Sequence, residues 1–172
     1  TKVVERGDAD GVFINTTAIG CVEHGLELSP LAVRPGDAVL VSGDLGRHGL
    51  AILAARPELG LRTSVSSDLA PLQPMVHRLL DAGLTVHCLR DLTRGGLGAA
   101  IDELNEPAIP HHPAVDGACA LLGLDPLTMA NEGRMVVLCP ADQAKEALAL
   151  LREEHASATQ IGTVLKPLLI DD

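Results

Sequence analysis

Residues 34–49, RPGDAVLVSGDLGRHG, combine a turn, a short apolar run and a glycine-rich connection in one continuous stretch. The PGD sequence at 35–37 is typical of a turn. The four apolar residues at 38–41 predict a strand that is buried on both faces. Residues 42–49 then lead into a predicted helix over 50–55. A buried strand that passes through glycines into a helix indicates a domain in which helices cover a sheet.

Outward from this stretch, apolar runs and helical periodicities alternate along the chain. The further predicted strands are 85–89, 135–138 and 160–165, and the further predicted helices are 71–82, 97–104, 114–122 and 141–153. Residues 107–113 contain three prolines, which disfavour regular structure there. The pattern predicts an α/β (mixed α+β) fold with helices packed on a mixed sheet.

The beginning of the chain predicts a strand hairpin. Asp10-Gly11 is a turn signal, and residues 2–5 and 12–19 are the flanking strands. A two-stranded hairpin needs a further sheet to cover it. We therefore expect this segment to belong to another domain and the chain to be a piece of a larger protein.

Composition excludes several classes of protein. The chain has 172 residues, 47% apolar and 21% charged, which suits one folded core. Its net charge of −10 and single aromatic residue, Phe13, argue against nucleic-acid binding. No apolar run reaches the length of a membrane span, and the first residues do not resemble a signal peptide. A cytoplasmic location without membrane or nucleic-acid partners is predicted.

Two glycine-rich connections between an apolar strand and a predicted helix are candidate ligand sites. In the first, Gly43, Gly46 and Gly49 recur at every third position, which suits close approach of an anion to a helix N-terminus. A plain tight connection explains this pattern at least as well. The second, residues 91–96 with the sequence DLTRGG, has more polar groups than a connection requires, and Arg94 offers a planar donor fork for phosphate.

A third candidate is residues 130–134, ANEGR, just before an apolar strand. Glu132 beside a glycine is often only turn chemistry, but a carboxylate at a strand end can also serve as a general base. By residue type alone, Lys2 is an ordinary surface lysine. The adjacent His111 and His112 lack the spacing of a helical zinc site, so no metal ligand is predicted.

The chain resembles the hydrogenase expression/formation protein family HypE, within the superfamily of aminoimidazole ribonucleotide synthetase. The similarity runs in order over nearly the whole chain, and the stretch at 117–127 with the NEG sequence after it points to the hydrogenase branch. The matching stretches are 1–4 (TKVV), 13–16 (FINT), 35–37 (PGD), 41–43 (VSG), 48–49 (HG), 80–83 (LDAG), 86–91 (VHCLRD), 93–96 (TRGG), 117–127 (GACALLGLDPL) and 130–133 (ANEG).

The resemblance implies an ATP-dependent carbamoyl dehydratase. Such an enzyme converts a thiocarboxamide on its own C-terminal cysteine to a thiocyanate, which supplies cyanide for the iron of nickel–iron hydrogenase. It also implies ATP and Mg²⁺ as cofactors and a homodimer when the protein is full-length. The implied partners are a carbamoyltransferase maturation protein and iron–cyanide scaffold maturation proteins.

The resemblance also assigns residue roles. It implies that Lys2 and Glu132 are catalytic and handle the protons of the thiocarboxamide. The ATP phosphates would face Arg94, together with its neighbours in the same loop and with weaker matches elsewhere. Those further cofactor-binding residues are Thr93, Gly95, Gly96, Asp91 and His48.

The sequence departs from the family pattern in several places. The acidic Mg²⁺-binding residues of the family's N-terminal domain and its terminal cysteine are not in this sequence, and Arg47 stands where relatives carry an acidic residue. We expect residues 1–30 to be strands of an N-terminal domain and 31–172 to be the synthetase-like C-terminal domain. We expect little activity from the chain alone.

Two alternatives remain open. One is another ATP-dependent synthetase of the superfamily, against which the segment at 122–126 and the NEG sequence count. The other is a non-catalytic fragment that docks partner proteins, against which the retained TRGG loop counts.

Overall fold

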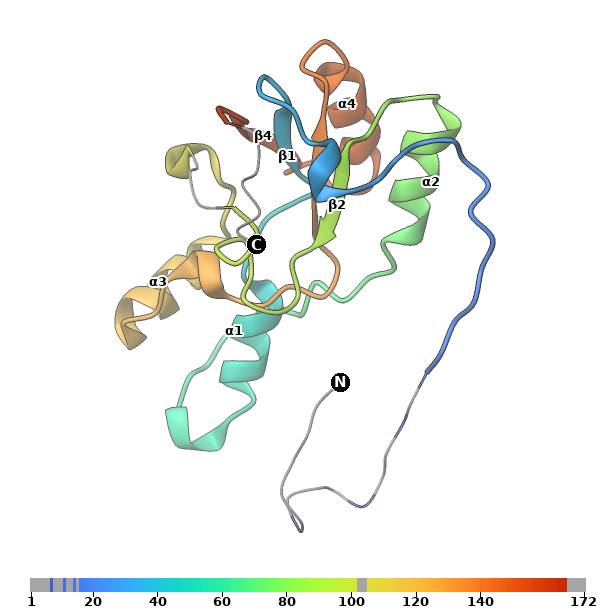
Figure 1. Ribbon diagram of the computed structural model, residues 1–172. Helices are drawn as coiled ribbons and strands as arrows, with labels where there is room; N and C mark the ends of the chain where they lie inside the picture. Colours follow the sequence, from blue (N-terminus) through green and yellow to red (C-terminus); the bar gives the residue numbers. More distant parts are fainter. Residues whose placement is uncertain (1–6, 8–10, 12–13, 15, 102–104, 167–172) are drawn as a thin grey trace.

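The computed structural model describes residues 7, 11, 14, 16–101 and 105–166. Its four strands and four helices follow one another in the order β1-α1-α2-β2-α3-β3-α4-β4, with short 3-10 turns among them (Figure 1). The strands are β1 (Ala38–Val41), β2 (Cys88–Asp91), β3 (Met135–Cys139) and β4 (Thr159–Thr163). The helices are α1 (Arg47–Ala54), α2 (Gln73–Asp81), α3 (Pro113–Leu122) and α4 (Ala144–Glu154).

The strands form one sheet in the order β2-β3-β1-β4. β1 and β3 lie at its centre and are buried along their whole length, which explains why both are continuous apolar runs. The predicted combination of helices and sheet is confirmed, but all three pairings among the described strands are antiparallel rather than mixed. β3 lies between β1 and β2, as in a split β-α-β unit, so those two strands never pair directly.

Different segments pack against the two faces of the sheet. On one face α2 and α4 pack over β1 and β3, with Met75, Leu79, Ala147 and Leu151 in the shared core. Connecting segments cover the other face. Their buried apolar side chains are Val33, Leu45, Leu92, Leu97 and Ile109.

Helices α1 and α3 pack together at one end of the sheet (Figure 1). Leu50, Val115 and Met129 form a small separate core between them. No helix in the described ranges has the length and apolar character needed to cross a bilayer.

The predicted helix over 97–104 is wrong in its described part, because residues 94–100 form successive turns. Gly95 and Gly96 have φ of +77° and +61°, a backbone conformation that interrupts a right-handed helix. The N–H of Gly98 is hydrogen-bonded to the carbonyl of Leu127 rather than to its own segment. Residues 102–104 lie outside the described ranges.

The predicted strand over 12–19 is also wrong for residues 14 and 16–19, which have no regular secondary structure. A strand needs a hydrogen-bonded neighbour, and the part of the chain that the structure describes offers none to these residues. The other half of the predicted hairpin, residues 2–5, lies outside the described residues.

The remaining elements occur where they were expected, with shifted ends. β2 begins at Cys88 rather than at 85, since the chain bends at His87, whose side chain binds Asp37. α1 begins at Arg47, directly after Gly46, so Arg47, His48 and Gly49 are in the helix rather than in the connection before it.

Candidate active site

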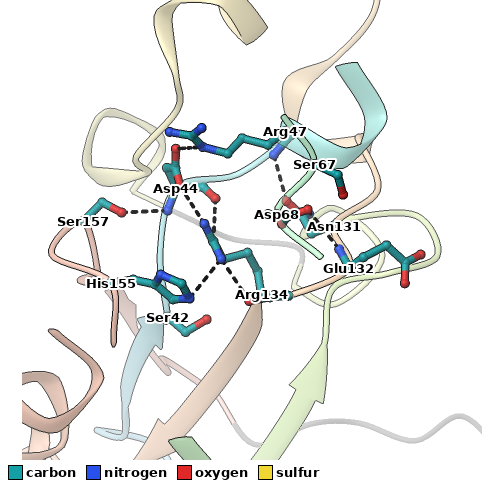
Figure 2. A network of polar contacts seen from close by, with 12 residues as sticks. Ser42, Asp44, Arg47, Ser67, Asp68, Asn131, Glu132, Arg134, His155 and Ser157 are labelled. Atoms are coloured by element: carbon teal, nitrogen blue, oxygen red, sulfur yellow. Dashed lines mark hydrogen bonds and ion pairs between the residues drawn. The ribbon is translucent and has the colours of Figure 1, made fainter. Parts of the chain in front are cut away.

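A network of polar side chains lies where β1 ends and β3 begins (Figure 2). Its centre is Arg134, whose side chain is only 6% exposed. The Nε of Arg134 donates to the main-chain carbonyl of Asp44 at 2.9 Å, and one terminal nitrogen donates to Asp44 Oδ1, also at 2.9 Å. The other terminal nitrogen donates to the Gly133 carbonyl at 3.0 Å. The guanidinium therefore ties the segment after β1 to the start of β3.

Asp44 is held by two arginines at once. Arg134 binds one of its carboxylate oxygens, and Arg47 Nε lies 2.5 Å from the other. Burial alone would raise the pKa of Asp44, but the hydrogen bonds from Arg134 and Arg47 outweigh burial and lower the pKa below its ordinary value of 3.8. Arg47 therefore works as the second cation of this carboxylate.

His155 joins the network as a hydrogen-bond acceptor. Its Nε2 lies 3.0 Å from Arg134, which can only donate. Burial, together with the neighbouring guanidinium, lowers the pKa of His155 below its ordinary value of 6.5. The neutral imidazole is therefore the form that this site accommodates.

Asn131 brings the three candidate segments of the sequence together. Its Oδ1 accepts the N–H of Gly46 at 2.8 Å, from the glycine-rich connection before α1. Its amide nitrogen donates to the carbonyls of Leu92 at 3.2 Å and Met129 at 3.0 Å. The side chain is fully buried, and its three hydrogen bonds all go to these segments and fix them to one another.

Glycine is required where these segments touch. A Cβ built on Gly133 would lie 2.0 Å from the carbonyl oxygen of Asp68, and one built on Gly96 would lie 2.3 Å from that of Leu127. The segment at 68–70 therefore lies directly against Gly133. The loop after β2 lies just as closely against the segment before β3.

Glu132 lies at the open edge of the network, and Figure 2 shows its side chain directed away from Arg134. Its side chain is 38% exposed, so a ligand can reach the carboxylate. Its main-chain N–H donates to Asp68 Oδ1 at 3.2 Å, and its Oε1 lies 3.9 Å from His48 Nε2. On its far side, the His48 ring lies 2.9 Å from Ser67 Oγ through Nδ1.

The predicted phosphate-facing loop follows β2. Thr93 donates its hydroxyl to Asp91 at 2.5 Å, which fixes both side chains. Arg94 and Gly95 are exposed, whereas Gly96 is buried against the segment before β3. The loop thus presents a guanidinium and main-chain groups to solvent on a fixed base, which suits an anionic ligand.

The structure brings some predicted site residues together and leaves others unplaced. Glu132 and His48 face each other, and the 91–96 loop is joined to Glu132's segment through Asn131. Lys2 lies outside the described residues. Asp44, Ser67, Asp68 and His155 were not predicted, because their partners are far away in sequence.

Comparisons with known proteins agree with this fold. The pattern of the family described as AIR synthase related protein, C-terminal domain, matches residues 34–167. The hydrogenase expression/formation protein HupE of Azotobacter chroococcum mcd 1 is 46% identical, over 96% of this chain and 52% of the relative. The carbamoyl dehydratase HypE of Cupriavidus necator is also 46% identical, over 96% of this chain and 51% of the relative. The chain thus spans about half the length of these curated relatives.

Solved structures give the same result. A crystal structure of the hydrogenase maturation protein HypE in complex with ATP matches with a TM-score of 0.75 and 41% identity, covering 80% of this chain and 45% of that one. HypE in a HypE–HypF complex matches with a TM-score of 0.78 and 35% identity, covering 86% and 52%. The resemblance to HypE is confirmed, and the chain belongs to the family of AIR synthase related proteins, with residues 34–167 as the C-terminal domain.

Proposed function

We propose that this chain is part of an ATP-dependent carbamoyl dehydratase of hydrogenase maturation, in which Glu132 is the general base. The observation that carries the proposal is the position of Glu132. Its carboxylate is accessible, its main chain is fixed by Asp68, and its segment is joined through Asn131 to the 91–96 loop. A base and an anion-binding loop on one rigid support suit a reaction that couples phosphoryl transfer to proton removal.

The reaction requires both a group that binds phosphate and a general base. An S-carbamoyl group, S–C(=O)–NH₂, becomes a thiocyanate, S–C≡N, by losing its oxygen and both nitrogen protons. Phosphorylation of the amide oxygen by ATP turns that oxygen into a leaving group, which departs within inorganic phosphate. The first nitrogen proton leaves to solvent as the oxygen is phosphorylated, and Glu132 would take the second as phosphate departs and the carbon–nitrogen triple bond forms.

The 91–96 loop fits the phosphates of ATP. Arg94 and the main chain at Gly95 are exposed and would hold the phosphate oxygens, while the Thr93–Asp91 hydrogen bond keeps the loop in place. ATP supplies the phosphoryl group when bound. Among the described residues there is no group of three His, Cys, Asp or Glu side chains that could hold a metal ion. Mg²⁺ remains part of the proposal only as the companion of ATP.

The wider proposals rest on the relatives. A carbamoyltransferase partner is supported by the HypE–HypF complex, in which a relative of this chain takes part. The iron–cyanide scaffold partners, the homodimer, the cytoplasmic location and the role of Lys2 stay predictions. So does the division of the chain into 1–30 and 31–172.

The test combines this chain with the unmatched half of the Cupriavidus necator relative. The mixture receives ATP and a peptide that ends in S-carbamoyl-cysteine, and mass spectrometry follows loss of one water from the peptide. We expect ATP-dependent conversion and a raised KM for ATP in Arg94→Ala, with Arg90→Ala on exposed β2 as the control. Peptide or partner binding without any conversion would contradict the proposal and favour the docking alternative.

A further inference from the structure

The segment at 67–68 contacts Glu132 directly through Asp68 and indirectly through the His48 side chain that Ser67 binds, although no sequence pattern marked it as part of a site. Asp68 is a buried residue, 7% exposed, and its Oδ1 accepts the main-chain N–H of Glu132. Ser67, its neighbour, reaches the side chain that faces the Glu132 carboxylate, namely His48. One short segment therefore acts on both the main chain and the carboxylate of the same residue.

Ser67 holds the His48 ring in place beside Glu132. Its Oγ accepts the N–H of Leu69 at 3.1 Å, which fixes the hydroxyl. The same Oγ lies 2.9 Å from His48 Nδ1, within hydrogen-bond distance. The opposite ring nitrogen, Nε2, faces Glu132 Oε1 at 3.9 Å.

The burial of Asp68 is a second, independent observation. Its Oδ2 is buried and has no hydrogen-bond partner within the described residues. An unpaired buried carboxylate oxygen lowers stability, and a residue that only supported the fold would be better replaced by a neutral one. A buried polar atom without a partner therefore calls for an explanation, of which a role in catalysis is one.

We propose that Ser67 and Asp68 are positioning residues for the general base. Asp68 fixes the main chain of Glu132, and Ser67 holds the His48 ring against the Glu132 carboxylate. This is the arrangement of a base oriented by a second group, which is itself oriented by a third. The inference rests on the proposed function, because it assigns the support of the base named there.

The experiment compares Ser67→Ala with Thr63→Ala in the combined protein described above. The two variants are matched, because each hydroxyl accepts the N–H two residues later at 3.1 Å, but only Ser67 reaches a histidine. We expect Ser67→Ala to lower kcat for conversion of the S-carbamoyl peptide about tenfold or more, with little change in KM. Thr63→Ala should not change kcat, and Ser67→Thr should restore activity.

Further variants at His48 and Asp68 test each of these contacts. If Ser67 acts through His48, adding Ser67→Ala to His48→Gln should lower kcat no further, whereas independent losses that multiply would overturn the inference. Asp68→Ala should lower kcat, and Asp68→Asn, which keeps an acceptor for Glu132, should restore it. Equal losses in Asp68→Ala and Asp68→Asn would also overturn it.

Glu132→Gln separates this inference from the proposed function. Full activity in Glu132→Gln would refute the proposed function, and the positioning inference with it. An inactive Glu132→Gln variant beside a Ser67→Ala variant that behaves like Thr63→Ala would refute the positioning inference alone.

Discussion

Arg134 holds Asp44 by both its main chain and its side chain, through two hydrogen bonds of 2.9 Å, although the two residues are 90 positions apart in the sequence. The pair is buried, with side chains 6% and 13% exposed. It joins the end of β1 to the start of β3, the two central strands. The position of the Glu132 segment depends on this pair, since Arg134 also binds the carbonyl of Gly133.

Removing the Arg134 guanidinium should therefore lower the free energy of unfolding. Arg134→Met leaves Asp44 with Arg47 alone and frees the carbonyls of residues 44 and 133, so we expect a loss of about 3 kcal/mol or more in the free energy of unfolding. Urea denaturation measures it. Arg78→Ala is the control, because Arg78 pairs with Glu153 and Glu154 at the surface and should cost at most about 1 kcal/mol. Equal losses in the two variants would contradict a central role for Arg134.

Stability should fall as the pH drops below the ordinary pKa of histidine. The pKa of His155 is lowered in the folded protein, so in this window the unfolded chain binds more protons than the folded one. The contribution of neutral His155 to the free energy of unfolding is complete above pH 6.5. It is lost as the pH falls through the lowered pKa that His155 has in the folded protein.

The corresponding measurement is urea denaturation at about pH 7.5 and about pH 5.5, above and below the ordinary pKa of histidine. His155→Gln can still accept from Arg134 but does not titrate, so its free energy of unfolding should change less between the two conditions. His77→Gln, at an exposed position of α2, is the control and should keep the wild-type dependence. The same dependence in all three proteins would show that His155 does not cause it.

Asn131 should not tolerate a charge. In Asn131→Asp the carboxylate still accepts from Gly46 but cannot donate to the carbonyls of Leu92 and Met129. We expect a loss of about 2–4 kcal/mol, measured by denaturation, because two buried acceptors would face an uncompensated charge. Asn105→Asp changes the same groups at an exposed position and should be nearly neutral.

Gly133→Ala should push the 68–70 segment away from the site. The new Cβ would lie 2.0 Å from the Asp68 carbonyl, so we expect a loss of about 1–3 kcal/mol in stability, together with reduced turnover of the S-carbamoyl peptide. Gly117→Ala in α3 meets no atom within 4 Å and should instead stabilise by about 0.5–1 kcal/mol. A Gly133→Ala variant with wild-type stability and turnover would show that the close approach is not needed.

The sequence predicted elements well where local pattern decides them. β1 and β3 are apolar runs because they lie at the centre of the sheet, and α2 and α4 show the helical spacing of the face they bury. The helix predicted at 97–104 is wrong over its described residues. Leu97 is buried in the core from a series of turns, so its apolar character does not reflect a helix. The strand directions were predicted wrongly, because they depend on the position of β3 between β1 and β2, which the local sequence does not indicate.

The candidate site was predictable only in part, for a similar reason. Glu132 and the 91–96 loop carry recognisable local sequences, which led directly to them. Asp68 is 64 positions from Glu132, and it lies in a segment without regular structure whose sequence resembles an ordinary loop. A residue that acts through such a distant contact leaves no local pattern to detect.

The most direct test of the account is the turnover of Glu132→Gln against Glu58→Gln, an exposed glutamate far along the chain. Both variants are combined with the unmatched half of the Cupriavidus necator relative and assayed for ATP-dependent conversion of S-carbamoyl-cysteine to S-cyano-cysteine. We expect Glu132→Gln to lower kcat about a hundredfold or more, while Glu58→Gln keeps wild-type turnover. Wild-type turnover in Glu132→Gln would contradict it.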